Sequence, residues 1–133
     1  MKLAALRTDL LILACAISAG IHGALVPDHL AEGAAAGIGF ATATVMLAAV
    51  AIAVTRRPES APALASAAAV LAGLLVSYVL AITPGLPVLH PEPEPITGLA
   101  LATKAIETLG LLAAWSLVWR PAVAVALPPT KGT

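Results

Sequence analysis

The stretch that decides the fold runs from Leu10 to Val26 and reads LLILACAISAGIHGALV. It contains no Lys, Arg, Asp or Glu. A helix of about 20 mostly apolar residues crosses the hydrocarbon core of a bilayer. This stretch therefore predicts a membrane-spanning helix, and three further apolar runs follow it.

The composition of the whole chain agrees with a membrane location. Of its 133 residues, 60% are hydrophobic and 11% are charged, whereas soluble domains carry about a quarter charged residues. This excludes an ordinary soluble domain, and the abundance of apolar residues excludes a disordered chain. The formal net charge is zero, so no basic face for nucleic acid is expected. The single cysteine, Cys15, is expected to be a small buried apolar residue.

Prolines and charged residues set the limits of the four runs. Pro27 and Pro62 are placed at the first turn of a helix, where a missing N–H is tolerated, and Pro84 and Pro121 are placed where a helix stops. We predict one all-α transmembrane domain over residues 1–133, a membrane-embedded four-helix bundle. Its helices are expected at about 8–26, 28–55, 62–83 and 96–119, followed by a short tail, 120–133.

Basic residues predict the orientation of this bundle, because Lys and Arg concentrate on the cytoplasmic side of a membrane. Six of them lie at one end if the helices alternate up and down: Lys2, Arg7, Arg56, Arg57, Arg120 and Lys131. The connections at the other end contain neither Lys nor Arg. We therefore predict an up-down-up-down bundle with both termini and the tail in the cytoplasm.

The outer end gathers imidazoles and carboxylates instead. All three histidines (His22, His29 and His90) are expected there, with Asp28, Glu32, Glu92 and Glu94. Such a set without a resident cation is typical of a cation site or a proton-handling site. A break at Pro27 would place His22 and His29 face to face across a hairpin. We predict a metal site formed by His22, His29, Glu32 and His90. A secondary polar site is predicted from Asp28, Glu92 and Glu94, together with Lys104 and Glu107 of the fourth run.

These outer residues also have simpler interpretations. Asp28, and Glu32 within the first turn, would cap the second helix and complement its dipole. Glu92 and Glu94 would then be solvated acids of a loop.

The fourth run contains a second polar feature, Lys104 and Glu107. Counted from Ile96 at about 1.5 Å per residue, the two residues lie roughly 12 and 16 Å deep. Charged groups at that depth cost free energy, and three-residue spacing allows them to form an ion pair. The pair is expected either to fix helix register or to serve as a proton relay at the floor of a polar cavity.

Small residues mark one face of the second run, among them Gly33 and Gly37. Such spacing lets helix backbones approach closely. The face is expected to pack within the monomer, or to form a homo-oligomer or a contact with a larger membrane complex.

Two resemblances add to this interpretation. The stretch GIHGALVPDHLAE from Gly20 to Glu32, with Phe40 and the later Glu107, resembles small four-span actinobacterial membrane proteins of unassigned function. This resemblance implies a multi-pass protein of a bacterial plasma (inner) membrane. The spacing of His22, Asp28 and His29 also resembles a motif of nickel/cobalt permeases and of hydrogenase/urease accessory permeases, where these residue types are taken to bind the metal.

The predicted function is binding of a divalent transition metal (zinc, copper(II), nickel or iron) at the outer site. The alternatives are a non-catalytic subunit or assembly partner of a larger complex, and a small cation transporter subunit with a proton-coupled Lys104–Glu107 pair. Haem needs axial histidines at matched depth on facing helices. It is not expected here, because His22 and His29 are both expected near the membrane interface. No nucleophile motif is present, so no catalytic residue is assigned.

Overall fold

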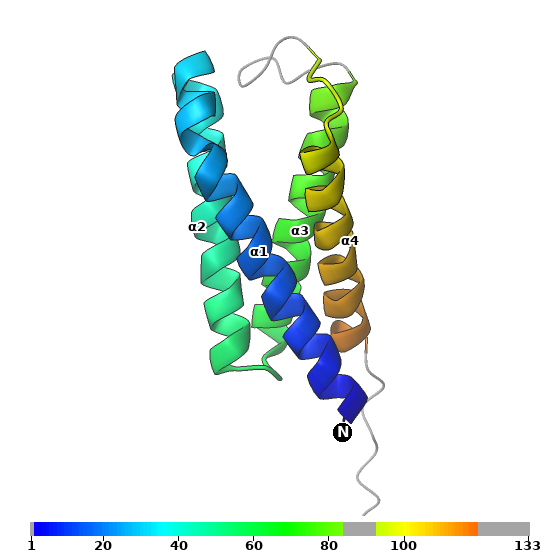
Figure 1. Ribbon diagram of the computed structural model, residues 1–133. Helices are drawn as coiled ribbons and strands as arrows, with labels where there is room; N and C mark the ends of the chain where they lie inside the picture. Colours follow the sequence, from blue (N-terminus) through cyan, green and yellow to red (C-terminus); the bar gives the residue numbers. More distant parts are fainter. Residues whose placement is uncertain (1, 84–92, 120–133) are drawn as a thin grey trace, which may run out of the picture.

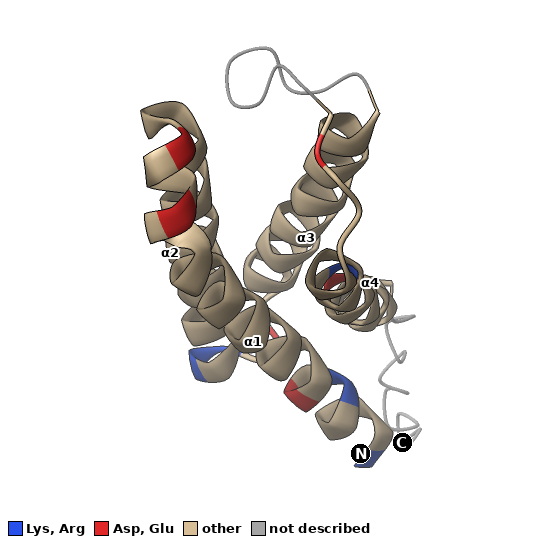
Figure 2. Ribbon diagram, turned by 45° about the horizontal axis from the view of Figure 1, so that its top comes forward, with Lys and Arg blue, Asp and Glu red and all other residues tan. Residues whose placement is uncertain are grey.

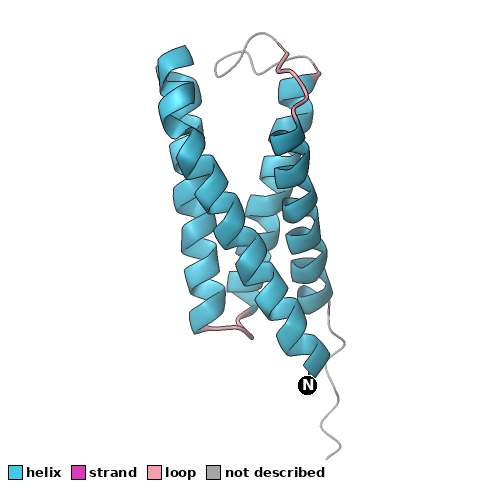
Figure 3. Ribbon diagram, viewed as in Figure 1, coloured by secondary structure: helices cyan, strands magenta, loops and turns pink. Residues whose placement is uncertain are grey.

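The computed structural model of the chain describes residues 2–83 and 93–119. Within this part the chain forms four helices and no strand. Helices α1 and α2 comprise Lys2–Glu32 and Ala34–Arg56, and helices α3 and α4 comprise Ala61–Ile82 and Gly98–Val118. The α1–α2 and α2–α3 connections are short, and Figure 3 shows the α2–α3 loop. All four are long and apolar enough to cross a membrane, which confirms the predicted all-α class.

The first helix is longer than expected, and this corrects the predicted break at Pro27. Helix α1 has 31 residues and contains Pro27 in its interior. Proline removes one helical hydrogen bond, but transmembrane helices tolerate it, since ending a helix would expose several more backbone groups. The chain turns instead at Gly33, where a Cβ would contact nothing. Four residues later, a Cβ on Gly37 would clash with Leu30, so glycine lets α2 pack against α1 there.

The other ends of the helices agree better with the sequence. They lie within two residues of the predicted limits, apart from the start of α1 at Lys2. Ser60 caps α3, accepting a hydrogen bond from the backbone N–H of Ala63, and Thr97 caps α4 in the same way through Ala100.

The apolar core occupies one half of the bundle. It contains residues from the first half of α1, the second half of α2, the first half of α3 and the second half of α4, including Leu11, Cys15, Leu47, Val54, Ala67, Leu71 and Ala114. These segments meet near the end of the molecule that carries the start of α1 and the α2–α3 connection (Figure 1). In that half, α4 approaches α1 closely, because a Cβ on Gly110 would lie 2.8 Å from the Cβ of Ala14.

The opposite half is open. The α1–α2 pair and the α3–α4 pair diverge toward the end where α1 meets α2 (Figure 1). Red acidic segments lie in the last turns of α1 and in the segment before α4, and blue basic segments mark the start of α1 and the end of α2 (Figure 2). The open half contains the candidate site.

Candidate functional site

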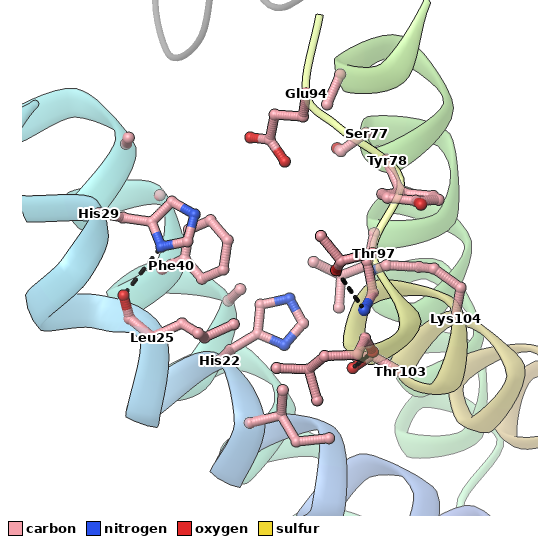
Figure 4. Close-up of a pocket in the computed structure, with 18 of the residues that line it drawn as sticks. His22, Leu25, His29, Phe40, Ser77, Tyr78, Glu94, Thr97, Thr103 and Lys104 are labelled. Atoms are coloured by element: carbon pink, nitrogen blue, oxygen red, sulfur yellow. Dashed lines mark hydrogen bonds between the residues drawn. The ribbon is translucent and has the colours of Figure 1, made fainter. Parts of the chain in front are cut away.

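A cleft of about 440 Å³ lies between the two helix pairs. Its walls are mostly apolar and include Ile21, Leu25, Phe40, Leu74 and Leu99. Polar side chains face it from both sides (Figure 4). His22 and His29 come from α1. On the other side, Tyr78 comes from α3, Lys104 from α4 and Glu94 from the segment before α4. The cleft thus has an apolar body and a few polar groups, as small-molecule sites usually do.

His22 and His29 lie on the same helix, which corrects the expectation that they face each other across a hairpin. They are seven residues apart on α1, which is two turns and about 10 Å along the axis. The ring of His29 stacks on Phe40 of α2 at 3.7 Å between centroids, and the ring of His22 lies 5.4 Å from the same ring. Phe40 therefore links the two histidines along the α1–α2 wall of the cleft.

Both histidines use the same nitrogen in the same way. The Nδ1 of His22 lies 2.9 Å from the carbonyl oxygen of Ser18, and the Nδ1 of His29 lies 2.9 Å from that of Leu25. Since a carbonyl oxygen only accepts hydrogen bonds, each Nδ1 carries the proton and donates it. The Nε2 atoms are thereby directed away from the helix backbone. That of His29 lies 4.0 Å from Oε2 of Glu32, which is three residues further along the same helix.

A buried polar network forms the floor of the cleft. Glu107 is completely buried, and Lys104 donates to its Oε2 at 2.6 Å. Ser18 of α1 donates to the other oxygen, Oε1, at 2.7 Å. The Nε2 of His22 lies 3.9 Å from this same oxygen. The predicted Lys104–Glu107 pair is therefore confirmed, and it is joined to α1.

The depths of these residues agree along the bundle. His22 is ten residues from the end of α1, and Glu107 is nine residues from the start of α4. At 1.5 Å per residue both lie about 14–15 Å below the open end. A side chain at this depth has no bulk water to solvate it, so each carboxylate oxygen needs a donor from the protein. Ser18 and Lys104 supply those donors.

Tyr78 is the remaining polar group of the α3–α4 wall. The Lys104 Nζ lies 5.5 Å from the centroid of its ring. Its hydroxyl is shielded from solvent and has no hydrogen-bond partner among the described residues. Ser77, Thr97 and Thr103 also line the cleft. Buried hydroxyls are normally partnered, so the Tyr78 hydroxyl is a donor left unsatisfied among the described residues.

The other predicted residues are divided between the mouth of the cleft and places outside it. Glu32 and Glu94 line the mouth, and the backbone N–H of Glu94 donates to the carbonyl oxygen of Ala81. Asp28 is exposed in the last turns of α1, so it does not cap a second helix. His90 and Glu92 lie outside the described residues. Within residues 2–83 and 93–119, no three His, Cys, Asp or Glu side chains converge on one point that could hold a metal ion.

Ser18 and Phe40 were not assigned to the site from the residues themselves. Ser18 precedes His22 by four residues, a spacing that puts the two on one helix face. That spacing was the one available signal. Phe40 is the only phenylalanine of the chain, and nothing in its local sequence distinguishes it from a lipid-facing residue.

Comparison with protein-family models, with curated proteins and with solved structures finds no match to this chain. Its function is therefore argued from its own residues.

Proposed function

We propose that the chain is a multi-pass membrane protein that binds a small molecule in the cleft between its two helix pairs. The observation that carries this proposal is the form of the cleft: about 440 Å³, apolar walls, and a buried His22–Glu107–Lys104 floor. Ligand sites commonly have volumes of about 300–1,000 Å³ and few, converging polar groups. Ionisable groups at mid-membrane depth mark binding sites or pathways by default.

The proposed orientation is an up-down-up-down bundle with both termini in the cytoplasm of a bacterial plasma membrane. It is supported by the basic residues, since Lys2, Arg7 and the Arg56–Arg57 pair lie at the end opposite the cleft (Figure 2). Trp115 and Trp119 are exposed near that end of α4, as interfacial anchors are. In this orientation the cleft opens on the extracytoplasmic side.

A divalent transition metal is the second candidate ligand, and one observation favours it. A histidine that binds a metal usually donates its other ring N–H to a carbonyl or a carboxylate. His22 and His29 both donate their Nδ1–H to a carbonyl oxygen, the arrangement that metal-bound histidines commonly have. The complete predicted set includes His90, so this site stays a prediction. Calorimetry with zinc, on wild type and on a His22→Ala/His29→Ala double variant, tests it, and equal heats would reject it.

The chain offers a direct test of the main proposal, because it contains one tyrosine and one phenylalanine. Both line the cleft. Fluorotyrosine labelling therefore gives a single fluorine resonance, from Tyr78, in protein held in phosphatidylcholine nanodiscs. We expect at least one of three probes of different charge (decanoate, decanol or decyltrimethylammonium) to shift this resonance saturably.

A matched pair of variants shows whether the shift comes from the cleft. Ala100 lines the cleft on α4, and Ala102 is exposed on the same helix outside it. We expect Ala100→Phe to abolish the saturable shift and Ala102→Phe to leave it unchanged. Failure of every probe to shift the resonance, or equal effects of the two variants, would overturn the proposed function.

A further inference from the structure

We propose that the ligand of the cleft is an amphiphile with an anionic oxygen head group, such as a carboxylate, held by Lys104 and Tyr78. This inference rests on the proposed function and specifies the ligand class. It follows from which donors and acceptors at the floor of the cleft are already used and which are not.

The acceptors of the floor are occupied. Glu107 accepts from Ser18 at Oε1 and from Lys104 at Oε2, and its side chain is completely buried behind the cleft lining. A cationic head group would have to displace Lys104 from this carboxylate. It would then leave the lysine without its partner at a depth where unpaired charge is costly. A cation is therefore disfavoured at the floor.

The donors, in contrast, are only partly used. A lysine ammonium carries three N–H groups, and among the described residues Lys104 donates one of them, to Glu107. The side chain of Lys104 is 15% exposed and lines the cleft. The Tyr78 hydroxyl beside it has no partner in the described part of the chain. Among the described residues no acceptor meets the remaining Lys104 N–H groups or the Tyr78 hydroxyl. The hydroxyl is shielded from solvent in this structure, so the Tyr78 side chain must turn toward the cleft to meet one oxygen of a carboxylate while Lys104 meets the other.

The charges of the floor can accommodate this anion. Lys104 and Glu107 compensate each other, so an incoming carboxylate adds one negative charge. The charged and titratable groups around the floor are Lys104 and Glu107 on α4, Tyr78 on α3 and His29 on α1, together with His22 itself. His22 lies 3.9 Å from Glu107 through Nε2, so one proton on that nitrogen restores neutrality. The anion is therefore expected to bind together with a proton.

Glu32 and Glu94 at the mouth oppose an anion, but weakly. Glu32 is 55% exposed, and charges near water are screened by the solvent and by salt. At the floor the Lys104 and Glu107 side chains are only 15% and 0% exposed, so charges there are screened less and interact more strongly. The apolar walls formed by Ile21, Leu25 and Leu74 then suit the hydrocarbon part of the molecule.

The test compares decanoate, decanol and decyltrimethylammonium in phosphatidylcholine nanodiscs, with protein-free nanodiscs correcting for partition. A fluorophenylalanine placed at position 40 alone, through an amber codon, serves as the reporter, so that Tyr78→Phe adds no second label. We expect wild-type protein to bind decanoate about tenfold or more tightly than the other two, as one or two charge-assisted hydrogen bonds allow. Tyr78→Phe should weaken decanoate binding several-fold and leave decanol binding unchanged.

The lysine is tested without leaving a buried charge unpaired. The double variant Lys104→Met/Glu107→Gln removes both charges, and Lys2→Met at the other end of the bundle is the control. We expect the double variant to bind decanoate no better than decanol and the control to behave as wild type. Equal binding of the three probes, preference for the cation, or a decanoate preference that survives the double variant would overturn the inference while the proposed function stands. Absence of binding by all three probes would reject both.

Discussion

Replacing Lys104 by methionine removes one partner of a completely buried carboxylate, and its cost can be worked out from the geometry. Unit charges 2.6 Å apart attract each other by about 6 kcal/mol at an effective dielectric constant of about 20. The desolvation of both groups offsets part of this attraction, and breaking such buried pairs costs about 3–5 kcal/mol in practice. We expect Lys104→Met to lower the free energy of unfolding by about 3–5 kcal/mol.

Replacing the other partner of the pair, Glu107, should cost less stability. Glu107→Gln keeps one acceptor oxygen, for Ser18 or for Lys104, and places an amide NH2 at the other position. The lysine is 15% exposed toward the cleft, so its charge keeps some access to water. We expect a loss of about 1–3 kcal/mol, the typical cost of weakening a buried hydrogen bond to a charged group. The double variant Lys104→Met/Glu107→Gln leaves no unpaired charge and should lie within about 1 kcal/mol of wild type. The two effects are thus expected to be strongly non-additive.

The lone cysteine provides the assay. Cys15 is completely buried in the apolar core, so its thiol reacts with a maleimide dye only when the bundle opens. Unfolding curves in mixed micelles with increasing dodecyl sulfate then give the stability of each variant. Additive losses in the double variant, or a Lys104→Met protein as stable as wild type, would refute the buried ion pair.

Three further changes test other parts of the structure. Ser18→Ala removes the donor to Glu107 Oε1 and should lower the stability by about 1–3 kcal/mol in the same thiol assay. The control, Ser116→Ala, loses only a hydrogen bond within α4 and should cost less. Gly37→Ala places a Cβ 2.3 Å from the Leu30 side chain and should cost about 1–3 kcal/mol by overpacking, while Gly33→Ala, where the space is open, should be nearly neutral. Equal losses for the two glycines would contradict the close approach of α2 to α1. Decanesulfonate, whose head group stays ionised throughout, should bind more tightly at about pH 5 than at about pH 8, because a bound anion favours the protonated imidazole of His22 and protonation in turn favours the anion. A His22→Gln protein that keeps this pH dependence would refute the link.

Residue types and spacing predicted much of the fold and part of the site. The four apolar runs needed only length and hydropathy, and the Lys104–Glu107 pair needed only its three-residue spacing within one helix. The position of the first turn was missed because Pro27 is a strong helix breaker in water. In a bilayer, one lost hydrogen bond costs less than the exposed backbone of two helix ends. Next to the true turn at Gly33, α2 approaches α1 so closely that a Cβ on Gly37 would clash with Leu30, and the residues alone do not predict this approach.

The position of that turn also explains why the site was only partly predicted. Ending the first helix at Pro27 would keep His22 close to the surface and opposite His29. Continuing α1 to Glu32 places His22 about 15 Å from the end of the helix instead of about 6 Å, which is the depth of Glu107. His22 and Glu107 are 85 positions apart in the chain, and no local pattern around either residue predicts that the two meet. Their meeting depends on the packing of α1 against α4.

The location of the polar floor follows from how the two halves of the bundle pack. Near the basic end, small residues such as Ala14 and Gly110 let α1 and α4 approach closely, and Leu11, Leu47 and Leu71 fill the space between the four helices. Above this layer the helix pairs diverge, and Ser18, His22, Lys104 and Glu107 lie where the packed half gives way to the cleft. A charged pair placed lower would be enclosed on all sides, and one placed higher would be solvated at the mouth. At the boundary, Glu107 is held by the protein while Lys104 faces the cleft, so a ligand that enters from the open end meets a charge whose counter-ion is already fixed behind it.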